Sequence, residues 1–410
     1  MISENFTDCQ IKAIEALNST QNVFITGPAG CGKSYIIKHF IKNIDDKYFP
    51  VLASTGAAAV LVGGRTFHSF FGLGIMEGGH QATVNRALDN KNTVRRIKRI
   101  EGFVLDEVSM LSAEVLSAAE DICRKVRDDS SPWGGLRVVA VGDFAQLPPV
   151  QKWGPKKWAF MDPLWKRSDF NTVFMKQNVR SEDQHFLDLL KKVRLGVCDT
   201  QVENFLNGKQ IGDSDDLVGT RLFPRRNQTD AYNMRRLQEI DEELVEFSSE
   251  VFGPERYIKQ LLQNAPVGEM VSIKRNCRVM IRQNDPRGRW VNGSSGRVED
   301  ISSENILVEL ENGRVANIEK ATFSMLDSEG KEVAAIRNFP LSLAYAATIH
   351  KSQGMTLDRM IVDLKSLWEP GHAYVALSRV RDPDHIYIQS WSKSSIKADQ
   401  KFKEFYSDFI

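Results

Sequence analysis

The stretch Gly27-Pro28-Ala29-Gly30-Cys31-Gly32-Lys33-Ser34 decides the fold of this chain, because it fits the phosphate-loop pattern G-x-x-x-x-G-K-[ST]. Residues 22–26 predict a buried strand before it, and residues 34–43 carry apolar side chains at helical spacing after it. A glycine loop in this setting turns backbone N–H groups toward phosphate. The alternative, a chance glycine-rich turn, is disfavoured by the flanking strand and helix. We expect Lys33 to bind terminal phosphates and Ser34 to bind Mg²⁺.

The composition of the chain is that of a globular protein. It has 410 residues, of which 42% are hydrophobic and 26% are charged, enough for two to three domains. Lys and Arg number 54 against 53 Asp and Glu, so the whole-chain charge does not indicate a nucleic-acid partner. Any surface that binds a polyanion must therefore be local.

Cysteine usage and hydropathy indicate where the protein works. The five cysteines show no C-x-x-C pair and no zinc spacing, which favours reduced thiols and gives no reason to expect zinc. No stretch reaches about 18 uninterrupted apolar residues, and residues 1–20 lack the pattern of a secretory signal. We expect an intracellular protein that is neither secreted nor membrane-spanning.

A pair of carboxylates ends the next buried strand. Residues 102–106 are mostly apolar and finish in Asp106, which Glu107 follows. In a phosphate-loop ATPase, Asp106 would hold magnesium and Glu107 would polarise the attacking water. The alternative is an acidic pair at a helix N-terminus, because an amphipathic helix follows Ser112. The phosphate loop upstream favours the catalytic interpretation.

Two glutamines complete the predicted nucleotide site. Gln146 follows the apolar strand 136–141 and could sense a γ-phosphate, because ligands bind beyond the carboxyl ends of parallel strands. We therefore expect Lys33, Asp106 and Gln146 to converge. Gln10 lies at the start of a predicted amphipathic helix and could bind an adenine edge through its amide, although a solvated helix-start glutamine is the alternative.

The chain divides into two predicted lobes. The first lobe spans residues 1–170 and includes a surface excursion at 74–101, which ends in a basic run. The second lobe comprises 171–274 and 336–410. Residues 275–335 lie between these two segments of the second lobe. They contain short alternating strands and Asn-Gly turns, which predict a small antiparallel β insert.

Six ordered blocks of sequence resemble the petite-integration-frequency (PIF-type) DNA helicases, close to the RecD-like branch of superfamily one. The resemblance runs from Gln10 to Arg381. Its blocks are GPAGCGKS (27–34), ASTGAAA with FHSFFGLG (53–59 and 67–74), LDEVSM (105–110), GDFAQLPPV (142–150), HKSQGMT (350–356) and AYVALSRVR (373–381).

The resemblance implies an α/β fold of two RecA-like lobes, each a parallel sheet with flanking helices. It also implies a small strand-separating wedge at 74–101 and a Src-homology-3-like β-barrel at 275–335. ATP and Mg²⁺ would bind between the lobes, and single-stranded DNA would cross both. The expected activity is ATP-dependent 5′-to-3′ translocation with unwinding of tailed duplex DNA, by a monomer on DNA, in a compartment where DNA resides.

The resemblance also implies roles for individual residues. It places Gln10 on the adenine and Gly354 near the nucleotide, and its phosphate loop comprises Gly27, Pro28, Ala29, Gly30, Cys31, Gly32, Lys33 and Ser34. Magnesium would be held by Ser34 and Asp106, with Glu107 as general base and Gln146 as γ-phosphate sensor. Two arginine fingers would come from the second lobe, Arg180 and Arg379. The residues in blocks that face DNA are Thr55, His68, His350 and Ser352.

Departures from the family pattern leave other functions open. The chain has Val179-Arg180-Ser181 where the family usually shows Phe-Arg-Gln, and residues 74–101 lack an aromatic stacking pin. A translocating or remodelling ATPase that does not unwind duplex DNA is therefore the second hypothesis. A third, an inactive binding module, is disfavoured because the residues expected to act in catalysis are all present.

Overall fold

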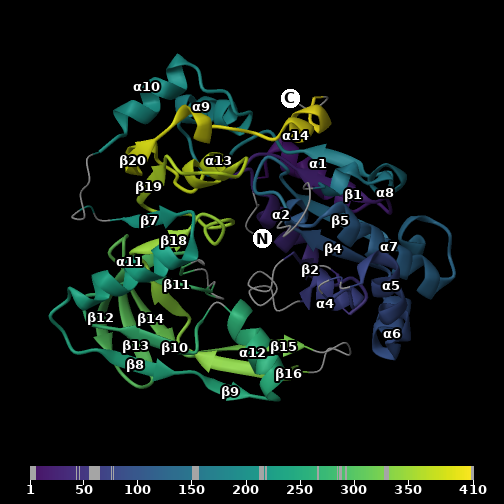
Figure 1. Ribbon diagram of the computed structural model, residues 1–410, viewed down its shortest axis with the longest axis horizontal. Helices are drawn as coiled ribbons and strands as arrows, with labels where there is room; N and C mark the ends of the chain where they lie inside the picture. The colour runs from purple at the N-terminus through teal and green to yellow at the C-terminus, as the bar shows by residue number, and fades with distance from the viewer. Residues whose placement is uncertain are drawn as a thin grey trace. The chain divides into compact units, whose positions relative to one another are not determined.

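The computed structural model describes residues 6–42, 44–45, 47–54, 65–74, 76, 78–149, 157–211, 217, 219–265, 267–283, 285, 289–290, 293–326 and 332–407. The chain divides into two compact units. The first unit comprises Met1–Arg180, Leu326–Glu332 and Gln400–Ile410, and the second comprises Ser181–Met325 and Val333–Asp399. Each unit has its own parallel sheet (Figure 1).

The first unit is built on a parallel sheet with the strand order β3-β2-β4-β5-β1-β6. Its strands are β1 (Val23–Thr26), β2 (Val51–Ala53), β3 (Arg65–Thr66), β4 (Gly102–Asp106), β5 (Arg137–Gly142) and β6 (Asn171–Phe174). Strands β1 and β5 are apolar and almost wholly buried, as expected for central strands covered on both faces. The strands predicted at 22–26, 102–106 and 136–141 are confirmed.

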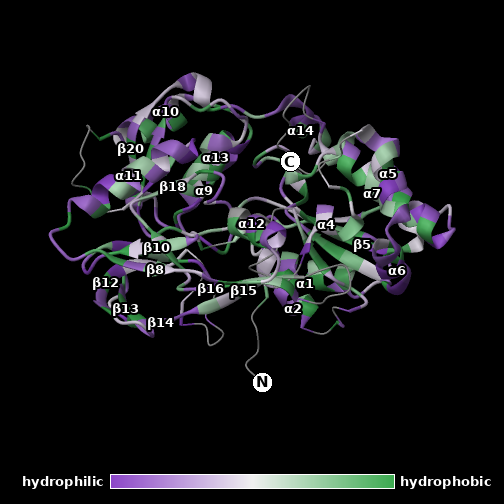
Figure 2. Ribbon diagram, turned by 60° about the horizontal axis from the view of Figure 1, so that its bottom comes forward, coloured by the Kyte–Doolittle hydropathy of each residue, from purple (hydrophilic) through white to green (hydrophobic). Residues whose placement is uncertain are grey.

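Helices of the first unit pack against this sheet and against one another. They are α1 (Asp8–Leu17), α2 (Lys33–Ile41), α4 (Phe67–Phe71), α5 (Gly79–Asp89), α6 (Lys91–Arg99), α7 (Ala113–Arg127), α8 (Pro163–Arg167) and α14 (Gln400–Phe405). Helices α5 and α6 form the predicted excursion and both pack on α7. Helix α6 is strongly hydrophilic (Figure 2). Within the described residues, no helix is long and apolar enough to span a membrane.

The predicted lobe boundary at residue 170 is wrong. Strand β6 pairs in parallel with β1, with Phe24 opposite Thr172 and Ile25 opposite Val173. This pairing satisfies the backbone groups along one side of β1, so the strand belongs to the first sheet. The first unit extends to Arg180.

The end of the chain also belongs to the first unit, although it was predicted in the second lobe. The Phe405 ring stacks on Phe160 with centroids 4.3 Å apart and meets Phe144 edge-on at 5.5 Å. Tyr406 is fully buried, and its hydroxyl forms a hydrogen bond with the hydroxyl of Thr26 at the end of β1. Aromatic burial therefore holds α14 to the first unit.

The second unit has a parallel sheet with the order β18-β7-β19-β20. These strands are β7 (Thr220–Phe223), β18 (Ala346–Thr348), β19 (Met360–Leu364) and β20 (Ile386–Trp391). The helices of this unit are α9 (Gln184–Arg194), α10 (Thr200–Gly208), α11 (Arg226–Gln238), α12 (Glu255–Asn264) and α13 (His372–Leu377). The α/β fold with two parallel sheets is confirmed.

The remaining strands of the second unit form antiparallel sheets. One has the order β14-β13-β12-β11-β17, and the others are β10-β8 and β15-β16-β9. The strands are β8 (Val245–Ser248), β9 (Glu250–Phe252), β10 (Met270–Ile273), β11 (Arg278–Ile281), β12 (Ser295–Ile301), β13 (Asn305–Leu310), β14 (Val315–Glu319), β15 (Ala321–Leu326), β16 (Glu332–Asn338) and β17 (Leu341–Leu343).

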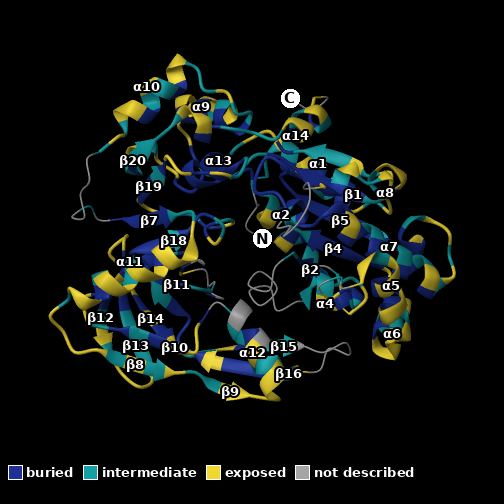
Figure 3. Cartoon of the chain, viewed as in Figure 1, coloured by how far each residue is buried: buried dark blue, intermediate teal, exposed yellow. Residues whose placement is uncertain are grey.

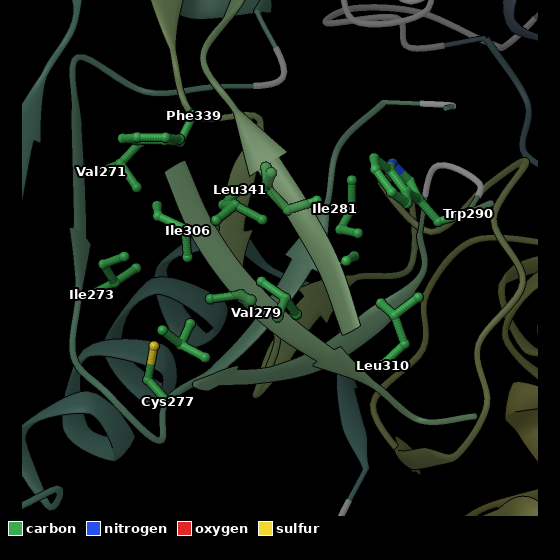
Figure 4. Close-up of a cluster of buried hydrophobic side chains, with 14 of the residues drawn as sticks. Val271, Ile273, Cys277, Val279, Ile281, Trp290, Ile306, Leu310, Phe339 and Leu341 are labelled. Atoms are coloured by element: carbon green, nitrogen blue, oxygen red, sulfur yellow. The ribbon is translucent and has the colours of Figure 1, made fainter. Parts of the chain in front are cut away.

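Strands β10 to β14 and β17 share one apolar core, and Phe247 of β8 packs against it (Figure 4). Val279 and Ile306 lie in it with Phe339 and Leu341, which come from beyond the predicted insert of 275–335. The antiparallel region is therefore larger than predicted. It begins at β8 and ends at β17, which pairs with β11.

Candidate ATPase active site

The phosphate loop connects the buried strand β1 to helix α2. Gly30 and Gly32 have φ of +83° and +86°, a region that disfavours residues with a side chain. A Cβ atom would lie 2.7 Å from Arg180 Cβ at Gly30, and 2.7 Å from Gln10 Nε2 at Gly32. Gly30 therefore requires glycine for backbone conformation and for space, and Gly32 requires it for backbone conformation.

Lys33 is held against its own loop. Its Nζ donates hydrogen bonds to the carbonyl oxygens of Gly27 at 2.7 Å and Pro28 at 3.0 Å. Ser34, the next residue of α2, is exposed at the start of the helix. The ammonium and the hydroxyl thus both lie at the N-terminus of α2, where phosphate binding is favourable.

Asp106 and Glu107 lie at the carboxyl end of β4. The backbone N–H of Glu107 donates to Asp106 Oδ1 at 2.9 Å. Burial raises the pKa of Asp106, while this hydrogen bond and the charge of Lys33 oppose the rise. Strands β1 and β4 belong to one parallel sheet, so the phosphate loop and the acidic pair lie at the same edge of that sheet.

Glu107 has an unusual backbone for a residue with a side chain, with φ 53° and ψ 48°. This left-handed conformation turns the chain sharply from β4 into the short 3₁₀ helix Val108–Met110. Non-glycine residues adopt it at a cost of roughly 1 kcal/mol or more, and such residues cluster at functional sites. The acidic pair is therefore placed by a strained turn. It does not begin a regular helix, as the alternative interpretation required.

Gln146 lies in a tight turn after β5. Its backbone N–H donates to the carbonyl of Asp143 at 3.0 Å, and Asp143 Oδ1 accepts from Ala145 N at 3.1 Å. Strands β4, β5 and β1 are parallel neighbours, so their carboxyl ends share one edge of the sheet. Lys33, Asp106 and Gln146 each follow or end one of these strands, as the sequence predicted.

Gln10 combines a capping role with a position at the phosphate loop. Its Oε1 accepts from Thr7 N at 3.0 Å and Thr7 Oγ1 accepts from Gln10 N at 3.3 Å, which forms a capping box at the start of α1. Its Nε2 faces Gly32. Gln10 is only 5% exposed, so it is not the solvated helix-start residue of the alternative interpretation.

Arg180 does not come from the second unit. The segment before it is bonded to the phosphate loop, since Asn178 Nδ2 donates to Ala29 O at 2.8 Å and Val179 N donates to Gly30 O at 2.8 Å. Asn178 Oδ1 also accepts from Arg180 N at 2.8 Å. The expectation that Arg180 reaches over from the second lobe is therefore wrong, because these bonds tie it to the first unit.

Arg379 lies in the interior of the second unit and is 1% exposed. It follows α13, which is buried throughout (Figure 3). Its guanidinium donates to Val375 O at 2.7 Å, Ser352 O at 3.2 Å and Ser378 Oγ at 2.7 Å. The arginine thus supports the loop that contains the HKSQGMT block.

The residues predicted to face DNA differ in their surroundings. His350 is partly exposed, whereas Ser352 is fully buried and its hydroxyl donates to Ile349 O at 2.8 Å. Gly354 lies in the same loop, is exposed and has φ +76°. The buried Ser352 therefore shapes this loop.

The remaining two residues of this group were predicted in the first unit. Burial lowers the pKa of His68, which lies in α4. The aromatic neighbours Phe67 and Phe71 pack against Phe103 of β4, so this block forms core. Thr55 lies outside the described residues.

Comparison with known proteins identifies the family. The model of the PIF1-like helicase family matches residues 5–204, and one described as helicase matches 296–410. The ATP-dependent DNA helicase Pif1 of Bdellovibrio bacteriovorus is 48% identical over 98% of this chain and 91% of its own length. The chain belongs to the PIF1-like helicase family. Human ATP-dependent DNA helicase PIF1 is 33% identical over 97% of this chain, which spans only 63% of the human protein.

Solved structures agree with this membership. Bacteroides Pif1 in complex with ADP-AlF4 has a TM-score of 0.84 and 27% identity, covering 98% of this chain and 96% of its own. Pif1 helicase from Candida albicans has a TM-score of 0.80 and 31% identity, covering 99% and 100%. The PIF1-like fold therefore extends over both units.

Glu107→Gln is expected to bind ATP but to hydrolyse it at least about a hundredfold more slowly, because the amide keeps the shape of the side chain but cannot accept a proton from water. Steady-state ATPase rates and nucleotide binding measure the two effects separately. Glu101→Gln, at the exposed start of the same sheet region, is the matched control. A variant that loses nucleotide binding would show that the carboxylate is structural.

Asn178 is a site residue that sequence reasoning missed. The signal was the Asn-Val-Arg order, which fits a turn in which the asparagine side chain accepts from the N–H two residues later. That signal predicts the local turn. It does not predict the second bond to Ala29, because the phosphate loop lies far away in sequence.

Asn178→Ala is expected to lower kcat for ATP about tenfold and to leave KM nearly unchanged, because it removes about 1–2 kcal/mol of bonding that positions Arg180 beside the phosphate loop. Gln177→Ala, its exposed neighbour, is the matched control. In an Arg180→Ala background the Asn178 substitution should add little. Fully additive losses would contradict a positioning role through Arg180.

Proposed function

We propose that this chain is an ATP-dependent DNA helicase that translocates 5′ to 3′ on single-stranded DNA and unwinds duplex DNA. One observation carries the proposal: in a member of the PIF1-like helicase family, Lys33, Asp106 and Gln146 lie at adjacent strand ends of one parallel sheet. Both the Bdellovibrio and the human relatives are named ATP-dependent DNA helicases.

Within this proposal, ATP binds with Mg²⁺. The Ser34 hydroxyl and the Asp106 carboxylate are oxygen donors of the kind that magnesium prefers. No group of three or more His, Cys, Asp and Glu side chains gathers as a metal site among the described residues, which fits an ion held mainly by phosphates and water. The metal would neutralise charge on the phosphates while Glu107 accepts the proton of the attacking water.

Residues of both units contribute to the proposed catalysis. Gln10 would contact the adenine and Arg180 would act on the phosphates from the first unit. In the second unit, the buried Arg379 would act through the loop that it supports, which contains Gly354 near the nucleotide. We further propose that β11–β14 and β17 form a Src-homology-3-like barrel. Binding and release of the γ-phosphate would bias the units between two states, and this cycle would move the protein along DNA.

The proposed partners are single-stranded and tailed duplex DNA. Bacteroides Pif1 has been solved bound to ssDNA, with a TM-score of 0.69 to this chain. Another structure describes DNA unwinding at forked dsDNA by two coordinating Pif1 helicases. We therefore propose that this chain acts as a monomer on single strands and that two copies act at a fork, as in that relative. His350 and the loop shaped by Ser352 would face the DNA, in a compartment that contains DNA.

An ATPase and unwinding assay tests the proposed function. ATP hydrolysis should rise strongly when single-stranded DNA is added, and a 5′-tailed duplex should be unwound while a 3′-tailed duplex is not. DNA-stimulated hydrolysis without any unwinding would favour the translocase hypothesis. Unwinding that requires a 3′ tail would contradict the proposed direction.

A further inference from the structure

Three loops of the second unit meet at one edge of its parallel sheet. Strands β18, β7 and β19 are parallel neighbours, so the residues that follow them emerge together. Arg225 follows β7 and Arg226 begins helix α11 directly after it. The loop after β18 contains His350 and Lys351, and the loop after β19 contains Trp368. Positive charge and aromatic rings are thus brought from three distant parts of the chain to one place.

Trp368 is exposed, but its ring packs against a buried side chain. The residue is 44% exposed, and its ring meets His372 edge-on with centroids 5.1 Å apart. His372 is fully buried and in turn meets the ring of His350 at 5.0 Å. A buried ring therefore fixes the orientation of Trp368, and an indole held in this way loses little conformational entropy when a ligand stacks on it.

One cation lies over the ring of this tryptophan, and other basic residues lie on the same edge of the sheet. The Arg225 guanidinium lies 5.4 Å from the Trp368 ring centroid, within cation–π range. Arg225, Arg226 and Lys351 are all exposed. Partial desolvation and the positive charges of Arg226 and Arg282 lower the pKa of Lys351. Desolvation is the largest cause of this lowering, and the two arginine charges add to it.

Acidic residues also lie at this edge. The carboxylate of Asp230 pairs with Arg226 at 3.3 Å. Its negative charge partly offsets the lowering of the pKa of Lys351. Glu369 follows Trp368 directly and is partly buried. An exposed tryptophan alone is ordinary on a protein surface. A tryptophan packed against a buried side chain, with a cation over its ring and further basic residues at the same edge, has the two chemistries that single-stranded nucleic acid requires, a stacking surface and phosphate-binding charge.

We propose that Trp368, with Arg225 beside it, is a stacking platform for an unpaired nucleobase of single-stranded DNA. The proposal rests on the proposed helicase function and adds a contact to it. The indole would stack on the base, and Arg225 would bind the adjacent phosphate. The platform is tolerant of sequence, because every base has a π face. Duplex DNA keeps its bases paired and stacked, so the platform selects single strands.

The test compares two strands with equal charge. The full chain is titrated into labelled oligothymidine and into an abasic strand of the same length, and binding is followed by fluorescence anisotropy. Trp368→Ala should bind oligothymidine roughly tenfold more weakly than the wild type, and Trp368→Phe should retain most of the affinity. Phe252→Ala, an aromatic residue 54% exposed on β9, is the control. Arg225→Ala should weaken binding to both strands and lower the salt dependence by about one phosphate contact.

The abasic strand separates stacking from charge and from misfolding. It should bind the wild type and Trp368→Ala equally. Equal affinity of these two proteins for oligothymidine, or an equal loss on both strands, would overturn the platform while the helicase function stands. Failure of the wild type to bind either strand would overturn the proposed function as well.

Discussion

Lys33→Ala is expected to abolish ATP hydrolysis and to leave most of the DNA binding intact. Lys33 is the lysine of the phosphate loop, and its ammonium lies 2.7 Å and 3.0 Å from the loop carbonyls of Gly27 and Pro28. Without it, the terminal phosphates lose the cation that neutralises charge as the γ-phosphate leaves. Steady-state hydrolysis with saturating single-stranded DNA measures the loss, and DNA affinity is measured in parallel.

Lys38→Ala is the matched control for this prediction. Lys38 is an exposed lysine on the same helix α2, and its charge lowers the pKa of Asp106 less than the charge of Lys33 does. The control should keep nearly normal hydrolysis. Substantial turnover in Lys33→Ala would place the catalytic centre elsewhere in the chain.

The nucleotide site could be predicted because its signals are local. The strand, glycine loop and helix around Lys33 are contiguous in sequence. The loop pattern is expected to have a strand before it and a helix after it, and the sequence shows both. Asp106 and Gln146 could be added because a parallel sheet brings the carboxyl ends of its strands to one edge. The positions of these three residues could therefore be predicted from the expected strands and from a general rule of α/β sheets.

The lobe boundary could not be predicted because it depends on pairing and packing between distant residues. The composition of residues 171–174 predicts a strand but does not indicate which of the two sheets the strand joins. Only its pairing with β1 assigns it to the first unit. Likewise, Phe405 and Tyr406 belong to the first unit because they pack on Phe144 and bond to Thr26. Such contacts have no periodic signature in the sequence.

Roles of single buried side chains were the least predictable. Ser352 and Arg379 matched family blocks, but the structure shows that both bond to the backbone of their own unit. A motif identifies which residues matter to a family. Whether the residue contacts a ligand or supports the loop depends on burial, which the motif does not encode.

Arg180→Ala is expected to lower the rate of ATP hydrolysis roughly a thousandfold and to change nucleotide affinity much less, as for an arginine finger that acts on transition-state charge. Its backbone is already fixed to the phosphate loop through Asn178. The side chain is partly exposed, so its removal should leave the thermal unfolding midpoint nearly unchanged. Single-turnover hydrolysis, nucleotide titration and thermal unfolding measure the three quantities.

Arg379→Ala provides the contrast, because the two arginines have opposite environments. Arg379 is 1% exposed and donates hydrogen bonds to Val375 O, Ser352 O and Ser378 Oγ. Its removal leaves buried acceptors unsatisfied, so we expect a loss of at least about 2 kcal/mol in the free energy of unfolding together with a loss of hydrolysis. Arg379→Lys should recover part of the stability but little of the activity, because an ammonium cannot reproduce the branched donor geometry of a guanidinium. Normal hydrolysis in Arg180→Ala, or undiminished stability in Arg379→Ala, would contradict this division of roles.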